Sequence, residues 1–181
     1  MGLEGLLQDP HFYLIIRSEI EVALAFSELV TKSCLNRKVK PFEGKLLSLD
    51  PGETTGWALF QNLELHSAGQ IKEAPVMPHV ANYILTTRPD IVVCEDYKVY
   101  HWKCAQHSWS NLFTPRLLGV IEHTCITADP PIPLVFQMAG VVKGFCSDEK
   151  LKQWHYYKTS QPHARDAIRH GCYWLLFGKY E

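Results

Sequence analysis

The sequence predicts a mixed α/β fold in which helices pack on both faces of a five-stranded sheet. From residue 45 onward, short apolar runs bounded by Gly and Pro are separated by longer segments with helical periodicity. Three of the predicted strands follow one another before the first of these helices, and helices and strands alternate thereafter. A run of strands followed by such alternation is typical of a mixed sheet covered by helices.

Residues 1–44 differ from the rest and predict an N-terminal helical extension with a linker. Residues 17–32 have the pattern of an amphipathic helix, with apolar side chains at i, i+3, i+4 and i+7, namely Val22, Ala25, Phe26 and Leu29. The basic residues 36–40 and the proline after them predict a linker. We therefore expect two parts, 1–44 and 45–181, with the first helix packed on the second part or on a partner subunit.

Five strands are predicted, at residues 46–49, 55–60, 63–71, 91–94 and 133–136. The first is a short apolar run that ends at Asp50 and is followed by the turn signal Pro51-Gly52. The fourth, Ile-Val-Val-Cys, runs directly into Glu95. Both runs are suited to buried strands, and each places an acidic residue at the carboxyl end of its strand.

Four helices are predicted in the same part, at residues 78–87, 109–124, 147–154 and 162–177. Ser147 is a good N-cap residue, and acidic residues follow it in the first turn. The last helix begins at Pro162 and stops at Gly178, which are favoured residues for these two positions. Pro115 is expected to kink or restart the second helix.

Composition is that of an ordinary globular protein, with 46% hydrophobic and 20% charged residues. No apolar run approaches the ~20 residues that span a bilayer, and the run at 12–16 is too short for a secretory signal. The six cysteines form no CxxC pair and no zinc-like spacing, which favours reduced thiols in a cytosolic protein. Residues 96–181 carry 10 Lys and Arg against 7 Asp and Glu, a weakly basic balance that permits a polyanionic partner.

Asp50 and Glu95 are the first candidate site residues, because each ends a buried strand. Such a carboxylate is held by rigid backbone and opens to the crevice beyond the strand ends, where α/β sheets bind ligands. Burying an unpaired carboxylate costs several kcal/mol, so these acids need a metal, another cation or solvent. Alternatively, Asp50 has only a structural role, as the first residue of the Asp-Pro-Gly turn at 50–52. Asp96 should point to the opposite side of its strand from Glu95.

His163 and Asp166 form the third candidate element. Residues at i and i+3 share one helix face, so both side chains project together from the start of the last helix. The alternative is that Asp166 only stabilises the helix N-terminus electrostatically. Three carboxylates and an imidazole, brought from two strand ends and a helix start, would make an oxygen-rich site suited to Mg²⁺ or Mn²⁺. Two such ions roughly 4 Å apart can promote phosphodiester hydrolysis.

Three motifs in this order resemble the RuvC-type Holliday junction resolvases, particularly their compact bacteriophage versions. They are Leu-Ser-Leu-Asp-Pro-Gly at 47–52, Val-Val-Cys-Glu-Asp at 92–96 and His-Ala-Arg-Asp-Ala at 163–167. The resemblance covers residues 45–178 and implies a ribonuclease-H-like fold, a homodimer and cleavage of four-way DNA junctions in a bacterial or phage-infected cytosol. It also implies two Mg²⁺ ions, replaceable by Mn²⁺, bound by Asp50, Glu95, His163 and Asp166.

The resemblance further implies residues that act near the DNA. Lysines after the fifth strand lie near the scissile phosphate in this family, which favours Lys150 as a catalytic residue and, less directly, Lys143. The loop after Glu95 interleaves aromatic and cationic residues, as surfaces that stack unpaired bases do. Partly buried aromatic residues and solvated lysines are the alternative there. The predicted DNA contacts are Tyr97, Lys98, Tyr100, Trp102, Lys103, Arg116, Lys143 and Arg165.

Three other functions fit parts of this pattern. Asp-Pro-Gly-Glu-Thr-Thr-Gly at 50–56 resembles the phosphate-binding hairpin of actin-like ATPases and sugar kinases, but those enzymes need two such domains and a second Gly-rich loop. A nuclease for RNA–DNA hybrids or for other branched DNA would use the same metal site. A catalytically silent DNA-binding module is less consistent with an intact set of acidic residues.

Overall fold

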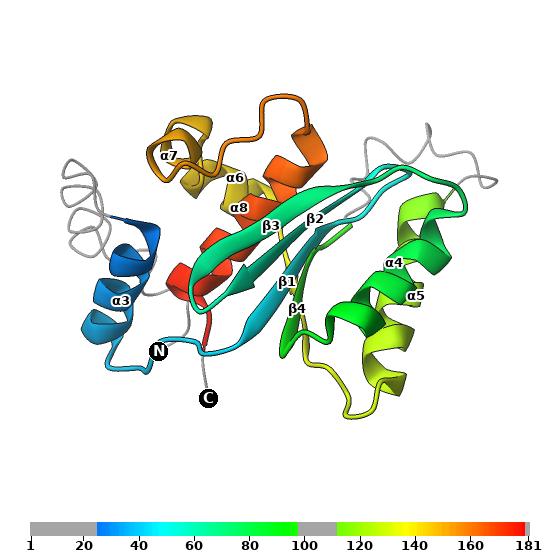
Figure 1. Ribbon diagram of the computed structural model, residues 1–181, viewed down its shortest axis with the longest axis horizontal. Coiled ribbons are helices and arrows are strands. Elements are labelled where there is room, and N and C mark those ends of the chain that lie inside the picture. The colour runs from blue at the N-terminus through cyan, green and yellow to red at the C-terminus, as the bar shows by residue number, and fades with distance from the viewer. Residues whose placement is uncertain (1–24, 98–111, 180–181) are drawn as a thin grey trace.

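The computed structural model describes residues 25–97 and 112–179. Its centre is a five-stranded sheet with the strand order β3-β2-β1-β4-β5 (Figure 1). The strands are β1 (Lys45–Asp50), β2 (Thr55–Gln61), β3 (Glu64–Ile71), β4 (Ile91–Glu95) and β5 (Leu134–Gln137). The first three form an antiparallel meander, whereas β4 pairs parallel with β1 and β5 pairs parallel with β4. The predicted mixed sheet is therefore confirmed.

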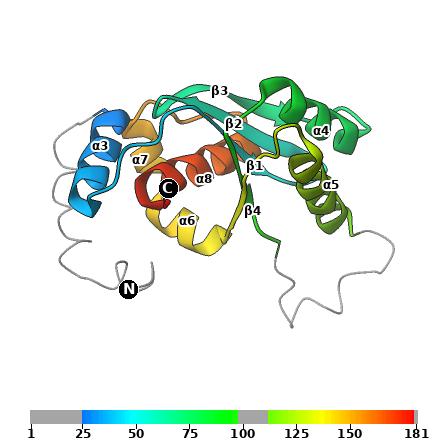
Figure 2. The same cartoon turned by 90° about the horizontal axis from the view of Figure 1, so that it is seen from below.

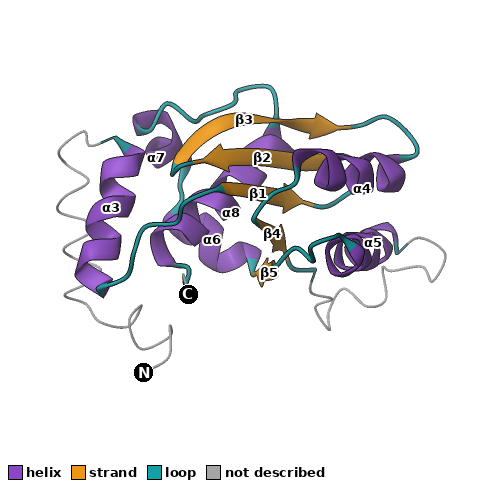
Figure 3. Cartoon of the chain, turned by 60° about the horizontal axis from the view of Figure 1, so that its bottom comes forward, coloured by secondary structure: helices purple, strands orange, loops and turns teal. Residues whose placement is uncertain are grey.

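Helices cover both faces of this sheet (Figure 3). They are α3 (Phe26–Arg37), α4 (Val76–Thr87), α5 (Phe113–Thr127), α6 (Ala139–Phe145), α7 (Asp148–Gln153) and α8 (Pro162–Phe177). Successive residues of β1 point to opposite faces, so Leu46 packs in the α8 core while Leu47 packs in the α4–α5 core. Because β1 is buried on both sides, it holds its last residue, Asp50, in a rigid frame.

The long helix α8 lies across the sheet and contacts β1, β2, β3 and β4 (Figure 2). It begins with Pro162 at its first turn, and the N–H of Gly178 closes its last turn on the carbonyl oxygen of Trp174. Both predicted boundaries are confirmed. Eleven of the 16 residues of α8 are buried, so the packing of this helix decides where its polar residues lie.

The N-terminal helix differs from the prediction for residues 17–32. Helix α3 continues to Arg37, through two residues assigned to the linker, and ends where Lys38 adopts a left-handed conformation with φ 58°. Residues 17–24 lie outside the described part. Helix α3 packs on the end of α8, since Ser33 Oγ donates to the Leu176 carbonyl at 2.7 Å and Arg37 donates to the Gly178 carbonyl at 2.6 Å. These contacts with α8 stabilise the last turns of α3, which the local sequence pattern did not predict.

Two further differences concern helices around the site. Helix α6 was not predicted, because its seven residues include two glycines that mask its helical character. Helix α5 begins at Phe113, so Pro115 lies in its first turn and needs no kink. Helix α7 matches its prediction, with Ser147 Oγ accepting from the Lys150 N–H at 3.4 Å.

Among the described residues, no helix is both long and apolar enough to cross a membrane.

Candidate active site

The predicted acidic residues meet at one edge of the sheet, beside the first turns of α8. The parallel register pairs Leu49 with Cys94, so the next residues, Asp50 and Glu95, end neighbouring strands at the same level. Glu95 is in turn the register partner of Gln137 at the end of β5. Three adjacent strand ends therefore present polar side chains to α8, as expected for the ligand-binding edge of an α/β sheet.

Asp50 is 8% exposed, and its Oδ2 lies 2.8 Å from Nδ1 of His163. The pKa of Asp50 is raised to about 6, chiefly by burial and next by the negative charge of Glu95. The hydrogen bond from His163 acts in the opposite direction, and Asp166 contributes a further increase. Asp50 thus senses the negative charge of two other carboxylates, although burial is the main cause of its raised pKa.

The start of α8 approaches Asp50 closely because a glycine faces it. Gly56 on β2 is the register partner of Asp50. A Cβ atom at Gly56 would lie only 1.9 Å from the His163 carbonyl oxygen, so no other residue fits without moving the helix. Gln70 on β3 also fixes this turn, since its Oε1 accepts from the His163 N–H at 3.2 Å. Gly56 and Gln70 were not among the predicted site residues.

Lys143 on α6 lies between the other two acids. Its Nζ is 2.9 Å from Asp166 Oδ2 and 3.9 Å from Glu95 Oε2. Burial by itself would lower the pKa of Lys143, but the hydrogen bond to Asp166 and the charges of nearby carboxylates together raise it. The ammonium group therefore stays charged and partly offsets the negative charge of the site.

Arg169 holds Asp166 from the other side. Its guanidinium forms ion pairs with Asp166, one turn earlier on α8, and with Asp148 at the start of α7. Its Nε also donates to the Cys146 carbonyl at 2.9 Å. Arg169 thus connects α8 to the α6–α7 junction and orients the carboxylate of Asp166. The pairing of Asp166 with Arg169 follows from their i, i+3 spacing.

His170 and Gln137 are two site residues that sequence reasoning missed. His170 is fully buried, and its Nε2 lies 2.9 Å from Glu95 Oε2. Its Nδ1 lies 2.9 Å from Gln137 Oε1. Helical spacing could have identified His170, because His163, Asp166 and His170 at i, i+3 and i+7 share one face of α8.

The structure separates the two candidate lysines. Lys143 contacts the carboxylates, whereas the Nζ of Lys150 lies 3.5 Å from the centre of the Phe145 ring. Lys150 is thus placed at an aromatic face, and its predicted catalytic role stays a prediction.

The other predicted DNA contacts have mixed outcomes. Arg165 donates to the carbonyl oxygens of Lys158 and Thr159 and lies over the Tyr157 ring, so its contacts are with that segment. Arg116 is exposed on the first turns of α5. Tyr97 is described and half-buried. Four of the contacts lie outside the described residues, namely Lys98, Tyr100, Trp102 and Lys103.

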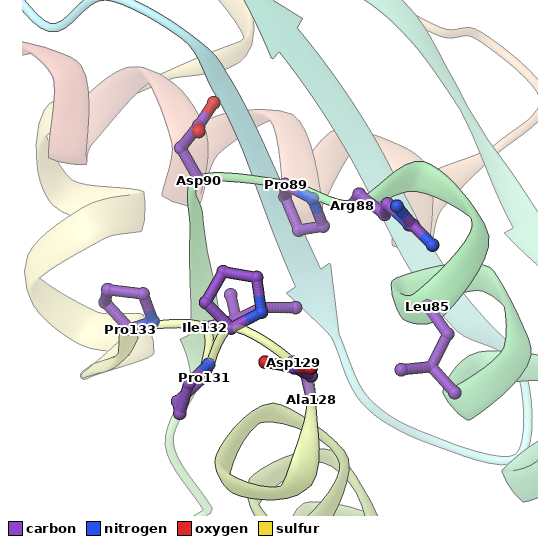
Figure 4. A pocket seen from close by; sticks show the side chains of 10 residues that line it. Leu85, Arg88, Pro89, Asp90, Ala128, Asp129, Pro131, Ile132 and Pro133 are labelled. Atoms are coloured by element: carbon purple, nitrogen blue, oxygen red, sulfur yellow. The ribbon is translucent and has the colours of Figure 1, made fainter.

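Two cavities lie near opposite ends of the strands. One of about 390 Å³ lies near the start of β4, and its lining includes four prolines together with Arg88, Asp90 and Asp129 (Figure 4). Asp90 already accepts from the Lys45 N–H at 2.7 Å, and no candidate acid lines this cavity. Another of about 480 Å³ includes Glu53, just after Asp50 in the chain, and Arg116. The second cavity lies beyond the same strand ends as Asp50, but none of the three candidate acids lines it.

The donor set fits Mg²⁺ or Mn²⁺ in its chemistry. Carboxylate oxygens are the ligands that these ions prefer, and a bound cation would stabilise the ionised form of the buried Asp50. Within the described residues, no three His, Cys, Asp or Glu side chains are arranged as a ready metal site. Each of the three acids instead has a nitrogen partner, supplied by His163, Lys143, Arg169 or His170.

Neither a protein-family model nor a curated protein matches this sequence. Solved structures do match in fold. RuvC of Thermus thermophilus, in complex with a Holliday junction substrate, is 16% identical, with a TM-score of 0.52 over 71% of this chain and 90% of RuvC. The chain shares its fold with RuvC. This similarity confirms the predicted ribonuclease-H-like architecture. Because the sequence identity is only 16%, the similarity bears on the fold alone.

Two further solved structures are similar to this chain. A second structure of T. thermophilus RuvC is also 16% identical, with a TM-score of 0.50 over 71% of this chain and 91% of that one. The fowlpox virus Holliday junction resolvase is 12% identical, with a TM-score of 0.48 over 72% of this chain and 97% of that one.

Proposed function

We propose that this protein is a metal-dependent endonuclease that resolves four-way DNA junctions by paired nicks. The observation that carries the proposal is the meeting of Asp50, Glu95 and Asp166 at one edge of a RuvC-like sheet. These acids come from two strand ends and one helix, in the places where the sequence predicted a metal site. Fold similarity alone would not carry it, because one fold can host many activities.

Asp50, Glu95 and Asp166 would hold the metal, with His163 as a further ligand. Mg²⁺ or Mn²⁺ bound there would supply an activated water and stabilise charge on the phosphate oxygens. The burial of Asp50 and its raised pKa favour binding of a cation, because a cation lowers the cost of keeping this carboxylate ionised. His163 holds Asp50 through Nδ1, so the orientation of one is linked to that of the other.

Lys143 has a separate role in this proposal. Its ammonium group now lies against Asp166 and near Glu95, and it is about half exposed. An exposed ammonium beside the metal ligands is suited to contact a phosphate oxygen of the DNA. We therefore assign to Lys143 the phosphate contact that the resemblance suggested for lysines after the fifth strand. Lys150 remains a second candidate for the same role.

The proposed substrate is a four-way junction, and its symmetry predicts a dimeric enzyme. A four-way junction has near two-fold symmetry, so two identical subunits can place one cut on each of two strands. The loop with Tyr97, Trp102 and Lys103 would contact the opened centre, and Arg116 would contact phosphates along an arm. The expected products are nicks that carry 5′-phosphates and 3′-hydroxyls.

The test is cleavage of a labelled four-way junction beside a linear duplex and an RNA–DNA hybrid of the same sequence, with Mg²⁺ present. Symmetrical nicks in the junction alone are the expected result. Cutting of the hybrid instead would retain the metal site and replace the substrate. No cutting of any substrate by a folded, metal-loaded protein would contradict the proposal.

A further inference from the structure

A buried histidine lies beneath the candidate site, between the ends of two strands. His170 is on α8, one turn after Asp166, and its side chain is 0% exposed. A buried imidazole is costly unless its nitrogens are hydrogen-bonded, and both have partners here. Nε2 lies 2.9 Å from Glu95 Oε2, and Nδ1 lies 2.9 Å from Gln137 Oε1.

We propose that His170 and Gln137 are positioning residues for the Glu95 carboxylate. Gln137 orients the imidazole ring, and the ring holds Oε2 of Glu95 in one place before a metal ion arrives. This inference rests on the proposed function, because it concerns the state of a metal ligand. Neither residue is assigned a direct part in the chemistry.

The backbone explains why this pair can hold Glu95 firmly. Glu95 and Gln137 are register partners on the parallel strands β4 and β5, so their Cα atoms are fixed relative to each other. A glutamate side chain has several rotatable bonds, and ordering it on binding a ligand costs free energy. The His170 contact restricts that freedom in advance, which should strengthen metal binding.

The contact does not depend on one protonation state of the ring. An ionised carboxylate can only accept, so Nε2 must donate to Glu95. Nδ1 faces an amide, which can accept through its oxygen or, turned over, donate through its nitrogen. The bond to Glu95 is therefore kept whether His170 is neutral or charged.

The experiment compares three variants of the full chain. His170→Phe removes the donor while keeping a ring, and His170→Gln keeps one donor. Ser48→Ala is the matched control, because Ser48 Oγ donates to the Ala167 carbonyl at 2.7 Å and so also links the sheet to α8 while touching no acid. Mn²⁺ affinity is measured by calorimetry on metal-free protein, junction binding is measured in EDTA, and stability is measured by urea unfolding.

We expect His170→Phe to weaken Mn²⁺ binding by about 10–100-fold, the usual effect of removing a residue that orients a metal ligand. Junction binding in EDTA should be unchanged, and kcat should fall with KM retained. His170→Gln should recover much of the Mn²⁺ affinity. Ser48→Ala should lower stability without changing that affinity. Unchanged affinity in His170→Phe, or an equal loss in Ser48→Ala, would overturn the inference.

Two further outcomes, an unfolded His170→Phe variant and an inactive wild-type protein, each require an additional experiment. If His170→Phe does not fold, Gln137→Met decides, since it removes the partner that orients the ring, and an unchanged Mn²⁺ affinity there contradicts the inference. If the wild-type protein neither binds Mn²⁺ nor cuts DNA, the proposed function fails. The contact is then tested by a double-mutant cycle of His170→Gln and Glu95→Gln in urea unfolding. Additive effects would show that the two side chains are not coupled.

Discussion

The two halves of α8 differ in what they contact. In the first half, residues 162–169, only three of eight residues are buried, and His163 and Asp166 lie beside the acids at the strand ends. In the second half, residues 170–177, all eight are buried, and most are apolar. The second half anchors the helix in the core, so that the first half can hold charged groups in place. Apart from His170, which contacts Glu95, the residues of α8 that stabilise the fold and those that lie at the site are thus separated along the helix.

Two glycines, Gly56 on β2 and Gly171 on α8, lie where the sheet and the two halves of the helix approach each other. Gly56 admits the His163 carbonyl at the start of α8. Gly171 lies in the second half, where an added Cβ would be 2.2 Å from the buried ring of Phe60. Each glycine lets the sheet and the helix approach, but only the first one borders the acids. Substitutions at the two sites should therefore have different consequences.

The largest expected effect is that of Asp166→Asn in the first half of α8. It removes a charge that the proposed site needs, so junction cleavage should fall by about 1,000-fold or more, while unfolding stability changes little. Leu176→Ala in the second half should instead lower stability by about 2–5 kcal/mol and leave the rate per folded molecule intact. Single-turnover cleavage and urea unfolding measure the two quantities. A loss of cleavage in folded Leu176→Ala would break the comparison.

Gly56→Ala should have the next largest effect on activity. The new methyl group would collide with backbone atoms of His163 and push the start of α8 away from Asp50. A displacement of about 1 Å at an active site costs on the order of 100-fold in rate. Gly119→Ala on α5 is the control, since nothing lies within 4 Å of its added Cβ. Equal cleavage rates for the two variants would contradict this account of the helix start.

The pH dependence of stability tests the surroundings of Asp50, which contacts the first half of α8 through His163. Folding raises the pKa of Asp50 from 3.8 to about 6, so the folded state favours the protonated carboxyl. In metal-free protein, this contribution is fully present below pH 4 and is lost as pH rises to about 6. The loss is on the order of 3 kcal/mol. Urea unfolding from pH 4 to pH 7 should show this decline relative to Asp50→Asn. Parallel curves for the two proteins would contradict the buried state of Asp50.

Gly171→Ala should have the smallest effect, and only on stability. Its added Cβ would meet Phe60 and, at 2.8 Å, Ser48 Oγ, both of which are fully buried. Overpacking of this kind typically costs about 1–3 kcal/mol. Thermal unfolding measures the loss, and the cleavage rate of the folded fraction should match the wild type. A rate reduced as much as that of Gly56→Ala would remove the distinction between the two halves.

The sequence predicted those parts of the site that depend on local structure. Asp50 and Glu95 could be found because each follows an apolar strand, and His163 and Asp166 because they share a helix face. Parallel pairing of β1 with β4 then brought the two strand ends level, which local patterns only suggest. The five strands and the ends of α8 were predicted for the same local reasons.

The remainder depends on contacts between distant segments. Gln137 reaches His170 only because β5 pairs with β4, and Lys143 reaches Asp166 only because α6 packs beside α8. The sequence favoured Lys150 over Lys143, whereas the structure places Lys143 at the acids. Helix α3 was predicted too early in the chain, because its end is decided by packing against α8.

The most direct test of the account is single-turnover cleavage of a four-way junction as Mg²⁺ is titrated into metal-free protein. Wild-type protein should cut only as Mg²⁺ is added. Asp50→Asn and Glu95→Gln should bind the junction in EDTA with wild-type affinity and fail to cut at any Mg²⁺ concentration. Cleavage by wild-type protein in EDTA, or retained cleavage by either variant, would contradict a metal site built on these two strand ends.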